Sequence, residues 1–273
     1  MTLPISPPVF ALLSRLIEDR FGIHYDAADA DLLADKIEHR VRERDLESLL
    51  DYYYFLRYDP CAGAEIESLI ESLVVRETYL FREPDSLNAL VQDLIPKRLA
   101  SSRTIRLWSA ACSTGEEPYT LAMMLSDAGL LERVEIVATD ISPRALATGK
   151  EGVYGGRALR AFPEKAKERH TTAHGSGAVQ VNGALRKCIS WARLNLLDDA
   201  AVAAMGLFDF ILCRNVLIYF SDETVQLVVA RLAGRLLPGG ILTVSVTESL
   251  LRHDSVLACE EHGGSFFYRK VTP

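Results

Sequence analysis

The chain has 273 residues, of which 49% are hydrophobic and 25% charged, an ordinary balance for a globular protein with a substantial core. Its formal net charge of −7 argues against general nucleic-acid binding, which needs a basic face. No apolar run approaches the roughly 18 residues of a membrane-spanning helix, and the N-terminal stretch lacks the basic flank of a signal peptide. The five cysteines never form a C-x-x-C pair, which indicates free thiols in a reducing, cytoplasmic compartment and argues against a zinc site.

The first part of the chain is patterned for helices. Ser6 and Pro7 form a helix start, apolar residues then recur at helical spacing, and Gly22 is a C-terminal stop. Further helices are expected over residues 29–44, 49–56, 63–74 and 85–100. We therefore predict a small N-terminal helical domain with its linker over residues 1–83, followed by a larger domain over residues 84–273.

Short β-like runs alternate with helical patterns after residue 102. Strands are expected at residues 105–109, 134–139, 189–194, 208–213 and 241–246, with helices at 117–128, 143–150 and 222–236 between them. Such alternation predicts an α/β fold with a mostly parallel, doubly wound sheet. Residues 256–271 add an antiparallel hairpin with a glycine turn.

The segment at residues 152–189 interrupts this alternation, and we expect an inserted subdomain or a mobile loop there. It carries His170 and His174, whose separation by four residues matches a metal pair on a helix. The neighbouring residues are rich in Gly, Ser and Thr and no third ligand is evident, so we interpret this stretch as a solvated loop and predict no metal.

The turn after the first predicted strand, at residues 109–119, consists of small residues followed by acids. Ligands of open α/β sheets bind at the carboxyl ends of strands, where small residues let the backbone approach. The run is not G-x-G-x-x-G, and Glu116 with Glu117 would repel a pyrophosphate, so an adenosyl ligand that is cationic or neutral is favoured over a dinucleotide. The alternative is a simple turn whose acids suit the helix dipole.

Polar residues follow two further predicted strands. Asp140 ends the second strand, about 25 residues after the first turn, a spacing that suits an acid binding both ribose hydroxyls. Alternatively, it only precedes the helix start at Ser142. Another apolar strand runs straight into Arg214 and Asn215, and Tyr219 follows, either as a site residue or as a core aromatic with a satisfied hydroxyl. The LPGG run at residues 237–240 predicts a tight turn before the next strand.

These segments together resemble the CheR-type chemotaxis receptor glutamate methyltransferases, and the resemblance covers nearly the whole chain. Its most specific parts are WSAACSTGEEPY (residues 108–119), ATDIS (138–142), NLLD (195–198) and CRNVLIYF (213–220). The family also has an N-x-T-x-F-F-R element, which reads RETYLFR here, so Thr78, Phe81 and Arg82 match while Arg76 and Leu80 differ. The resemblance implies a class I S-adenosylmethionine-dependent methyltransferase sheet with an antiparallel C-terminal hairpin, preceded by a helical substrate-docking domain.

The resemblance also implies a role for individual residues. S-adenosyl-L-methionine would be the cofactor and S-adenosyl-L-homocysteine the product, with cofactor contacts from Thr78, Arg82, Glu117, Asp140, Asn195, Leu196, Arg214 and Asn215, and an altered contact from Arg76. Arg82 and Tyr219 would lie beside the reacting methyl group and the incoming glutamate. A glutamate carboxylate has a pKa of about 4.3 and is ionised at neutral pH, so direct displacement needs no general base.

The implied acceptor is the cytoplasmic helical domain of methyl-accepting chemotaxis receptors, and we expect the enzyme to act as a monomer. Lys36, His39, Arg40 and Arg42 fall mostly along one side of the second predicted helix and would dock the acidic methylation helix of the receptor. The alternative is an ordinary solvated face. Some family members also bind a receptor-tail pentapeptide through a β insertion, but the glycine-rich middle of residues 152–189 favours tether-independent action.

Two other functions stay open at this point. A class I methyltransferase acting on a different acceptor would have the same cofactor contacts and would differ only on the acceptor side. A non-catalytic protein that binds S-adenosylmethionine to regulate a signalling array is the second alternative, because Arg76 replaces the family Asn.

Overall fold

The computed structural model describes residues 3–251 and 256–271, which fall into two compact units. The helical unit comprises Met1–Val75 together with Tyr219–Val225, and the sheet unit comprises Arg76–Ile218 together with Gln226–Pro273. Within the described residues, no helix combines the length and the apolar character that crossing a membrane requires.

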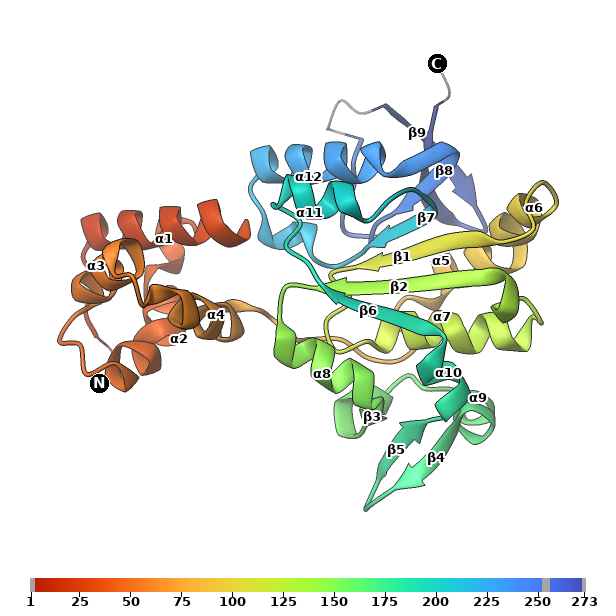
Figure 1. Cartoon of the computed structure of the whole chain (residues 1–273), viewed down its shortest axis with the longest axis horizontal. Coiled ribbons are helices and arrows are strands. Elements are labelled where there is room, and N and C mark those ends of the chain that lie inside the picture. Colours follow the sequence, from red (N-terminus) through yellow and green to blue (C-terminus); the bar gives the residue numbers. More distant parts are fainter. Residues whose placement is uncertain (1–2, 252–255, 272–273) are drawn as a thin grey trace. The chain divides into compact units, whose positions relative to one another are not determined.

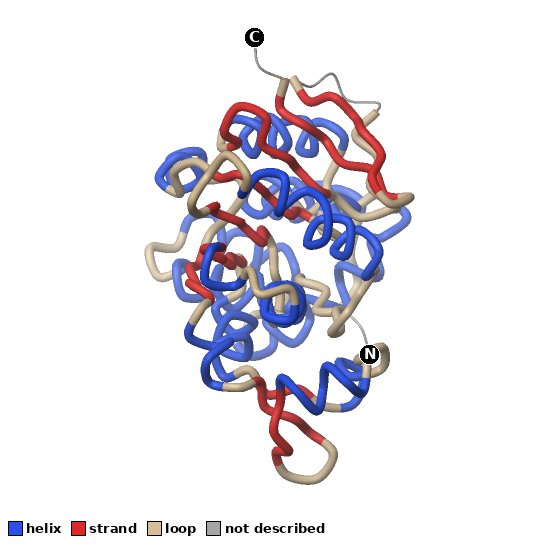
Figure 2. Tube along the Cα trace, turned by 90° about the vertical axis from the view of Figure 1, so that its right-hand side faces the viewer, coloured by secondary structure: helices blue, strands red, loops and turns tan. Residues whose placement is uncertain are grey.

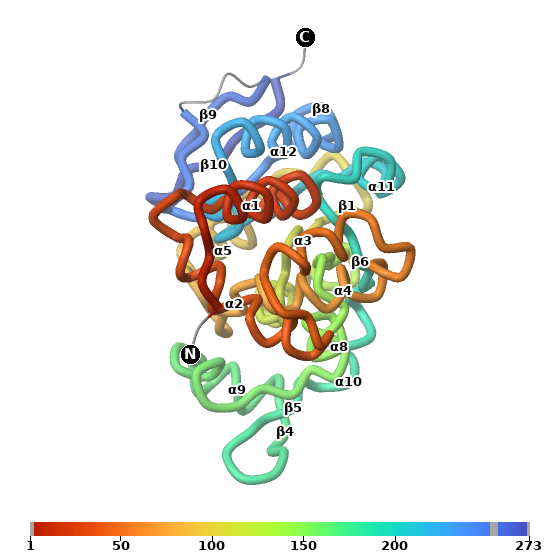
Figure 3. Tube along the Cα trace, turned by 90° about the vertical axis from the view of Figure 1, so that its left-hand side faces the viewer, coloured from red at the N-terminus to blue at the C-terminus, as the bar shows by residue number. Residues whose placement is uncertain are grey.

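The helical unit contains four α-helices, drawn in red to orange in Figure 3. They are α1 (Pro7–Phe21), α2 (Ala30–Glu43), α3 (Leu49–Tyr58) and α4 (Ala62–Leu73), with a 3-10 turn η1 (Ala27–Asp29) before α2. Prolines occupy the first turn of α1, and Gly22 ends it at φ 80°, a left-handed conformation that glycine adopts without strain. All four predicted helices are confirmed to within two residues at each end.

A buried carboxylate lies in the core of this unit. The Glu65 side chain has 0% exposure, and its oxygens accept hydrogen bonds at 2.6–2.9 Å from Tyr52, Arg40 and Arg44. Burial by itself would raise the pKa of Glu65, but the hydrogen bonds from these three residues and the charge of Arg40 outweigh it and hold the pKa below its usual range. Glu65 therefore joins α4 to α2 and α3 as a carboxylate anion.

Replacing Glu65 by glutamine is expected to lower the free energy of unfolding of the full chain at pH 7 by about 3 kcal/mol, because two arginines lose a buried anionic partner. Since the folded pKa is depressed, this advantage of the wild type is present above the unfolded value of about 4.3 and is lost as the pH falls through the folded pKa. Urea unfolding of both proteins at pH 7 and at about pH 3 measures the difference.

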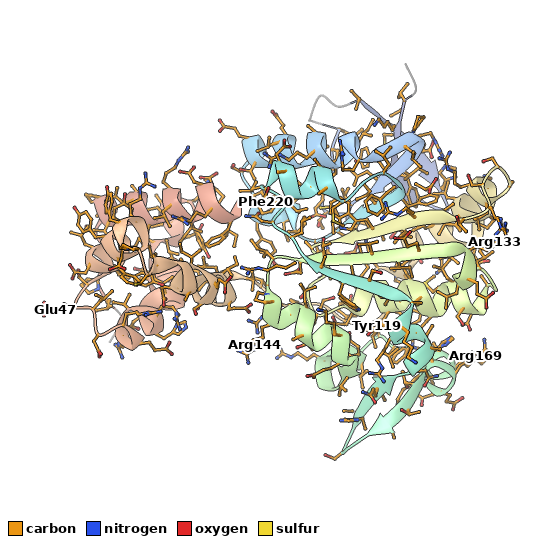
Figure 4. The ribbon with its side chains drawn as sticks, in the orientation of Figure 1. Glu47, Tyr119, Arg133, Arg144, Arg169 and Phe220 are labelled. Atoms are coloured by element: carbon orange, nitrogen blue, oxygen red, sulfur yellow. The ribbon has the colours of Figure 1, made fainter. Side chains whose placement is uncertain are left out.

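Glu47→Gln is the matched control, since Glu47 is exposed in the loop between α2 and α3 (Figure 4) and should leave stability unchanged. A difference between wild type and Glu65→Gln that is equal at both pH values would contradict the assignment of Glu65 as a charged core residue.

The sheet unit is built on a seven-stranded sheet with the order β6-β2-β1-β7-β8-β10-β9 (Figure 1). Its strands are β1 (Ile105–Ala110), β2 (Val134–Asp140), β6 (Ile189–Arg193), β7 (Phe208–Cys213), β8 (Leu236–Thr243), β9 (Leu257–His262) and β10 (Ser265–Lys270). The first five in spatial order are parallel, whereas β10 is antiparallel to both β8 and β9. The predicted doubly wound sheet closed by an antiparallel hairpin is confirmed.

Helices cover the sheet and complete its core. They are α5 (Pro84–Ala89), the π-turn η2 (Leu90–Leu94), α6 (Ile95–Leu99), α7 (Glu116–Asp127), η3 (Leu131–Arg133), α8 (Pro143–Glu151), α11 (Asp199–Ala204) and α12 (Asp222–Gly234), whose first turn is counted with the helical unit. One core cluster joins the α5–α6 stretch and α7 to the strand residues Leu107, Ile136, Phe210 and Phe267.

Two sequence-based boundaries need correction. The helix predicted over residues 85–100 is interrupted by the π-turn Leu90–Leu94, since Pro96 has no N–H to donate to the preceding turn. The LPGG run does not form a turn ahead of its strand but lies inside β8, which already begins at Leu236. A register shift opposite Phe208 and Phe210 and the φ of 70° at Gly239 make this stretch a bulge within the sheet.

Residues 152–189 fold into a subdomain with its own antiparallel sheet, in the order β3-β5-β4. Its elements are β3 (Val153–Tyr154), η4 (Gly156–Leu159), α9 (Glu164–His170), β4 (Thr171–His174), β5 (Ala178–Val181) and α10 (Gly183–Lys187). The β4–β5 hairpin projects at the lower end of Figure 2. The segment therefore contains regular secondary structure and a small sheet of its own.

The interpretation of the histidine stretch as a solvated loop is therefore wrong. His170 ends α9, is buried, and its Nε2 lies 2.9 Å from an oxygen of Asp127, while His174 ends β4 and is exposed. The pattern was misread because the Gly and Ser residues form only the β4–β5 turn. In the described part of the chain, no group of three or more His, Cys, Asp or Glu side chains could hold a metal ion.

Candidate functional site

The loop between β1 and α7 has an unusual backbone. Ala111, Ser113 and Gly115 have φ values of 56°, 50° and 90°, so two non-glycine residues adopt the left-handed conformation. The end of β2 holds the loop, since Cys112 N donates to the backbone O of Thr139 at 2.9 Å and Ser113 N donates to the side-chain Oδ2 of Asp140 at 2.8 Å. Such strain persists only where its surroundings over-determine it, and it is typical of ligand-binding loops.

Asp140 lies at the carboxyl end of β2, buried beside this loop. Its Oδ1 accepts a hydrogen bond from Ser142 N at 2.9 Å, so each carboxylate oxygen has one backbone donor. A carboxylate at this edge of the sheet is an acceptor of the kind that ribose hydroxyls require. Ser142 supplies the helix cap itself, because its Oγ accepts from Ala145 N at 2.9 Å. The position of Asp140 therefore fits a nucleoside-binding acid.

Glu117 and Arg214 form a buried ion pair between α7 and the end of β7. Arg214 Nη1 donates to Glu117 Oε2 at 2.9 Å, and the Arg214 side chain is only 2% exposed. The other Glu117 oxygen accepts from Ser109 Oγ at 2.7 Å. Both members of the pair were sequence-predicted site residues, and the structure brings them into direct contact.

A residue that sequence reasoning missed completes this cluster. Glu83 Oε2 accepts from Arg214 Nη2 at 3.0 Å, and its Oε1 accepts from Asn215 Nδ2 at 3.1 Å. Arg214 Nη2 also lies 3.2 Å from the carbonyl oxygens of Arg82 and Glu83. Burial alone would raise the pKa of Glu83, but the bond from Asn215 and the charge and hydrogen bond of Arg214 lower it overall.

Glu248 is the second residue that the sequence did not reveal. It is buried just after β8, and its two oxygens accept from four backbone N–H groups: Asn215 at 2.7 Å, Leu217 at 2.8 Å, Ile218 at 3.3 Å and Ser245 at 2.9 Å. These bonds hold the segment after β7, where Asn215 adopts a φ of 60°. The one sequence signal for Glu248 is an acid that follows an apolar strand at the ligand-binding edge of the sheet.

Asn195 and Leu196 follow β6 at the same edge. Leu194 N donates to Asp140 O at 3.0 Å, which ties this loop to the end of β2. Asn195 Oδ1 accepts from Leu197 N at 3.0 Å, and the buried Leu196 offers its carbonyl oxygen to Arg231 Nη1 at 3.1 Å. Beneath the loops, the Trp191 ring stands so close to Gly115 that a Cβ there would lie 2.5 Å from it. Any side chain at Gly115 would displace this packing.

The segment before α5 carries the remaining predicted cofactor residues. Arg76 and Thr78 are half-buried in a stretch without regular secondary structure. Arg82 Nη1 donates to the carbonyl of Glu77 at 2.7 Å, and its guanidinium lies 5.9 Å from the centroid of the Tyr79 ring. The segment is attached to the cluster through Arg214, which binds the carbonyl of Arg82.

Two buried thiols report the electrostatic character of this edge. Burial, followed by the charges of Asp140 and Glu117, raises the pKa of Cys112 well above its usual value. Burial, followed by the charges of Glu248 and Glu117, does the same for Cys213. The thiols therefore stay protonated, and their surroundings carry negative charge. Such surroundings suit a sulfonium cation and oppose a pyrophosphate.

Tyr219 and the four predicted docking residues belong to the helical unit. Tyr219 ends the 3-10 turn η5 (Leu217–Tyr219), and its carbonyl accepts from His24 N at 2.8 Å. Lys36 Nζ donates to Leu73 O at 2.9 Å, and burial lowers the pKa of its ammonium group. Arg82 belongs to the sheet unit, whereas Tyr219 belongs to the helical unit.

The docking residues do not form one free basic face. Lys36 and Arg40 turn inward. Lys36 binds the end of α4, and Arg40 pairs with the buried Glu65, so that the Arg40 side chain is only 13% exposed. Arg42 is exposed but pairs with Glu38 one helical turn away, and His39 lies 3.1 Å from Ser72 Oγ. The expectation of one basic stripe failed because α2 presents both of its sides to acidic or polar neighbours.

Strand order, the strained loop after β1 and the acid at the end of β2 define a class I S-adenosylmethionine-dependent methyltransferase. The chain matches the family described as "CheR methyltransferase, SAM binding domain" over residues 76–263 and "CheR methyltransferase, all-alpha domain" over residues 8–74. The chain therefore belongs to the CheR methyltransferase family, and S-adenosylmethionine is its cofactor.

Relatives carry two kinds of name. "Chemotaxis protein methyltransferase 2" of Vibrio cholerae is 30% identical over 91% of this chain and 88% of that protein. "Chemotaxis protein methyltransferase" of Vibrio parahaemolyticus is 34% identical over 90% of both chains. "Probable biofilm formation methyltransferase WspC" of Pseudomonas putida is 36% identical over 87% of this chain but only 56% of its own length.

Proposed function

We propose that the chain methylates glutamate side-chain carboxylates on the cytoplasmic helical domain of methyl-accepting chemotaxis receptors, and that it acts as a monomer in the cytoplasm. The products are glutamyl methyl esters and S-adenosylhomocysteine. The observation that carries the proposal is the place of Arg82 beside the cofactor cluster: its Nε lies 3.8 Å from Glu83 Oε1, and Arg214, paired with Glu117, also binds its carbonyl at 3.2 Å. A guanidinium beside the cofactor residues suits an acceptor that is an anion.

Bound S-adenosylmethionine supplies a methyl group on a positively charged sulfur. We assign its ribose to Asp140, its neighbouring contacts to Asn195, Leu196 and Glu117, and further contacts to Arg76, Thr78, Arg214 and Asn215. The acceptor carboxylate is already ionised, with a pKa of about 4.3, so the chain needs no general base. Arg82 orients that carboxylate by its forked donors, and the Tyr219 hydroxyl donates to the same group. Alignment of this kind supplies roughly 7–11 kcal/mol of barrier reduction.

The helical unit provides the first docking surface for the receptor in this proposal. The exposed side of α2, which carries His39 and Arg42, faces solvent, whereas Lys36 and Arg40 support the unit from within. Arg40 is therefore unsuitable for a charge-reversal test of docking, because the change would also disrupt its contact with Glu65. Receptor binding on α2 is better tested at Arg42.

Methyl transfer to carboxylates is tested with a donor labelled in its methyl group and a purified receptor cytoplasmic fragment. Base treatment of the labelled fragment should release volatile methanol, because methyl esters are base-labile. Fragments from a motility pathway and from a biofilm pathway are both assayed, since the relatives carry both names. A base-stable product would indicate a different acceptor group. Calorimetric binding of the cofactor without transfer to any fragment would indicate a binding-only protein.

Arg82→Ala and Tyr219→Phe are each expected to lower kcat by at least about tenfold, because each removes one donor that aligns the acceptor carboxylate. Circular dichroism should show an intact fold in both variants. The controls are Arg133→Ala and Tyr58→Phe. Arg133 lies at the other end of the sheet, just before β2 begins (Figure 4), and Tyr58 is an exposed residue of α3. Near-normal rates in both test variants would remove these residues from the mechanism.

A further inference from the structure

Arg82, which we propose to orient the acceptor carboxylate, lies in a group of three arginines around the exposed residue Glu77. Arg160 Nη2 lies 2.7 Å from Glu77 Oε1, and the exposed fractions of the two side chains are 39% and 51%. The Arg160 guanidinium also stacks over the Tyr79 ring at 3.7 Å from its centroid. Arg82 Nη1 contacts the same residue by donating to the Glu77 carbonyl at 2.7 Å. The arginines around Glu77 are therefore held by contacts and are also accessible to solvent.

The first turn of the inserted subdomain holds this group in place. Leu80 N donates to the carbonyl of Ala158 in η4 at 2.9 Å. Phe81 and Phe162 stack with their ring centroids 5.5 Å apart. These contacts fix residues 155–162 against residues 77–82, so Arg160 cannot move independently of the segment that contains Arg82. The sequence favoured tether-independent action for the insertion and did not connect it to Arg82.

Three arginines gather around Glu77 although the chain as a whole has a net charge of −7. The hydrogen bond and charge of Arg160, followed by the charges of Arg157 and Arg82, lower the pKa of the Glu77 carboxyl. Arg157 is exposed and is the second residue of η4, the turn that binds Leu80. Two carboxylates, Glu77 and Glu83, the latter 3.8 Å from Arg82 Nε, thus face these three arginines.

We propose that Arg82, Arg157 and Arg160, here called the arginine surface, dock the acidic helical segment of the receptor that surrounds the methylated glutamate. Glu77 occupies this surface in the free protein, and carboxylates of the incoming helix displace it. The inference rests on the proposed function and adds a docking site in the sheet unit. A carboxylate-bearing helix is the favoured partner, because the arginine surface already binds a carboxylate and the acidic chain repels longer polyanions.

Charge reversal at Arg160 gives the first test in the full-length chain. Arg160→Glu should raise KM for the receptor fragment by at least about fivefold at low salt, with an effect that shrinks as salt is added and falls on KM rather than kcat. The affinity for S-adenosylmethionine, measured by calorimetry, should stay within about twofold of wild type. Lys97→Glu is the matched control, since Lys97 is 65% exposed on α6 and the change in net charge is the same.

Neutralisation of Glu77 gives a second test with the opposite sign. Glu77→Gln should lower KM by about two- to threefold, because the arginine surface no longer has an internal carboxylate to displace. If the Glu77–Arg160 pair only supported the fold, the same change would leave KM unchanged or raise it. Arg160→Gln provides a milder variant in case Arg160→Glu does not fold, and circular dichroism decides between them.

Three outcomes separate this inference from the proposed function. A wild-type KM in Arg160→Glu, or a raised KM in Glu77→Gln, overturns the docking role while methyl transfer to the receptor stands. If the wild type transfers no methyl group to any receptor fragment, the proposed function fails. Binding of a fluorescein-labelled, glutamate-rich helical peptide then decides the docking role: weaker binding by Arg160→Glu supports it, and equal binding overturns it.

Discussion

Replacing Arg214 by alanine is expected to destabilise the full chain by about 3–5 kcal/mol and to weaken S-adenosylmethionine binding by at least about tenfold. The Arg214 side chain is 2% exposed and binds the carboxylates of Glu117 and Glu83 at 2.9 and 3.0 Å. Its removal leaves two carboxylates close together without their shared cation. It also releases the carbonyl of Arg82, so the segment that carries Arg82 loses its attachment to the cofactor cluster.

The measurements for Arg214→Ala are urea unfolding and calorimetric titration with the cofactor. Arg98→Ala is the matched control, because Arg98 Nε pairs with the buried Asp209 at 2.6 Å near the start of β7. That variant should lose stability but, once folded, should bind the cofactor normally. A folded Arg214→Ala protein with wild-type cofactor affinity would contradict the assignment of the Glu117–Arg214–Glu83 cluster to the cofactor site.

Replacing Glu248 by glutamine is expected to lower the free energy of unfolding by about 3 kcal/mol and to reduce kcat/KM by at least about tenfold. The two Glu248 oxygens accept bonds from the backbone of Asn215, Leu217, Ile218 and Ser245. Glutamine has nearly the same shape, but its amide NH₂ would face two N–H donors instead of accepting from them. The segment that carries Asn215 would therefore leave its left-handed conformation.

Unfolding and steady-state kinetics on Glu248→Gln are compared with Glu261→Gln, a change of the same size at an exposed position of β9. The control should match the wild type in both measurements. Unchanged kinetics in Glu248→Gln would show that the backbone after β7 holds its shape without this carboxylate.

The sheet could be predicted from the sequence because each buried strand is a short apolar run between turn signals. Asp140, Glu117 and Arg214 could be proposed as candidates for a related reason: Asp140 ends a strand, Arg214 follows one, and Glu117 lies in the first turn of a helix at the edge where parallel strands end. A local pattern of this kind predicts both the strand and the edge of the sheet at which the polar residue lies.

Glu83 and Glu248 could not be found in this way, because their roles depend on partners 131 and 33 residues away in the chain. The reading of α2 failed for the same physical reason. A helical pattern shows which charges share a side, but not that Glu65 on another helix meets Arg40. The arginine surface likewise needs the pairing of Leu80 with Ala158, which no local pattern predicts.

The assignment of Tyr219–Val225 to the helical unit has a consequence for domain exchange between family members. Phe220 forms an antiparallel bridge with Ile23, and a Cβ on Gly22 would lie 3.1 Å from the Phe220 ring. A chimera that joins the first 75 residues of one protein to the remainder of another would therefore pair mismatched partners at this bridge. Viable grafts should transplant residues 219–225 with the N-terminal helices, so that Tyr219 and Phe220 keep their native contacts with His24 and Ile23.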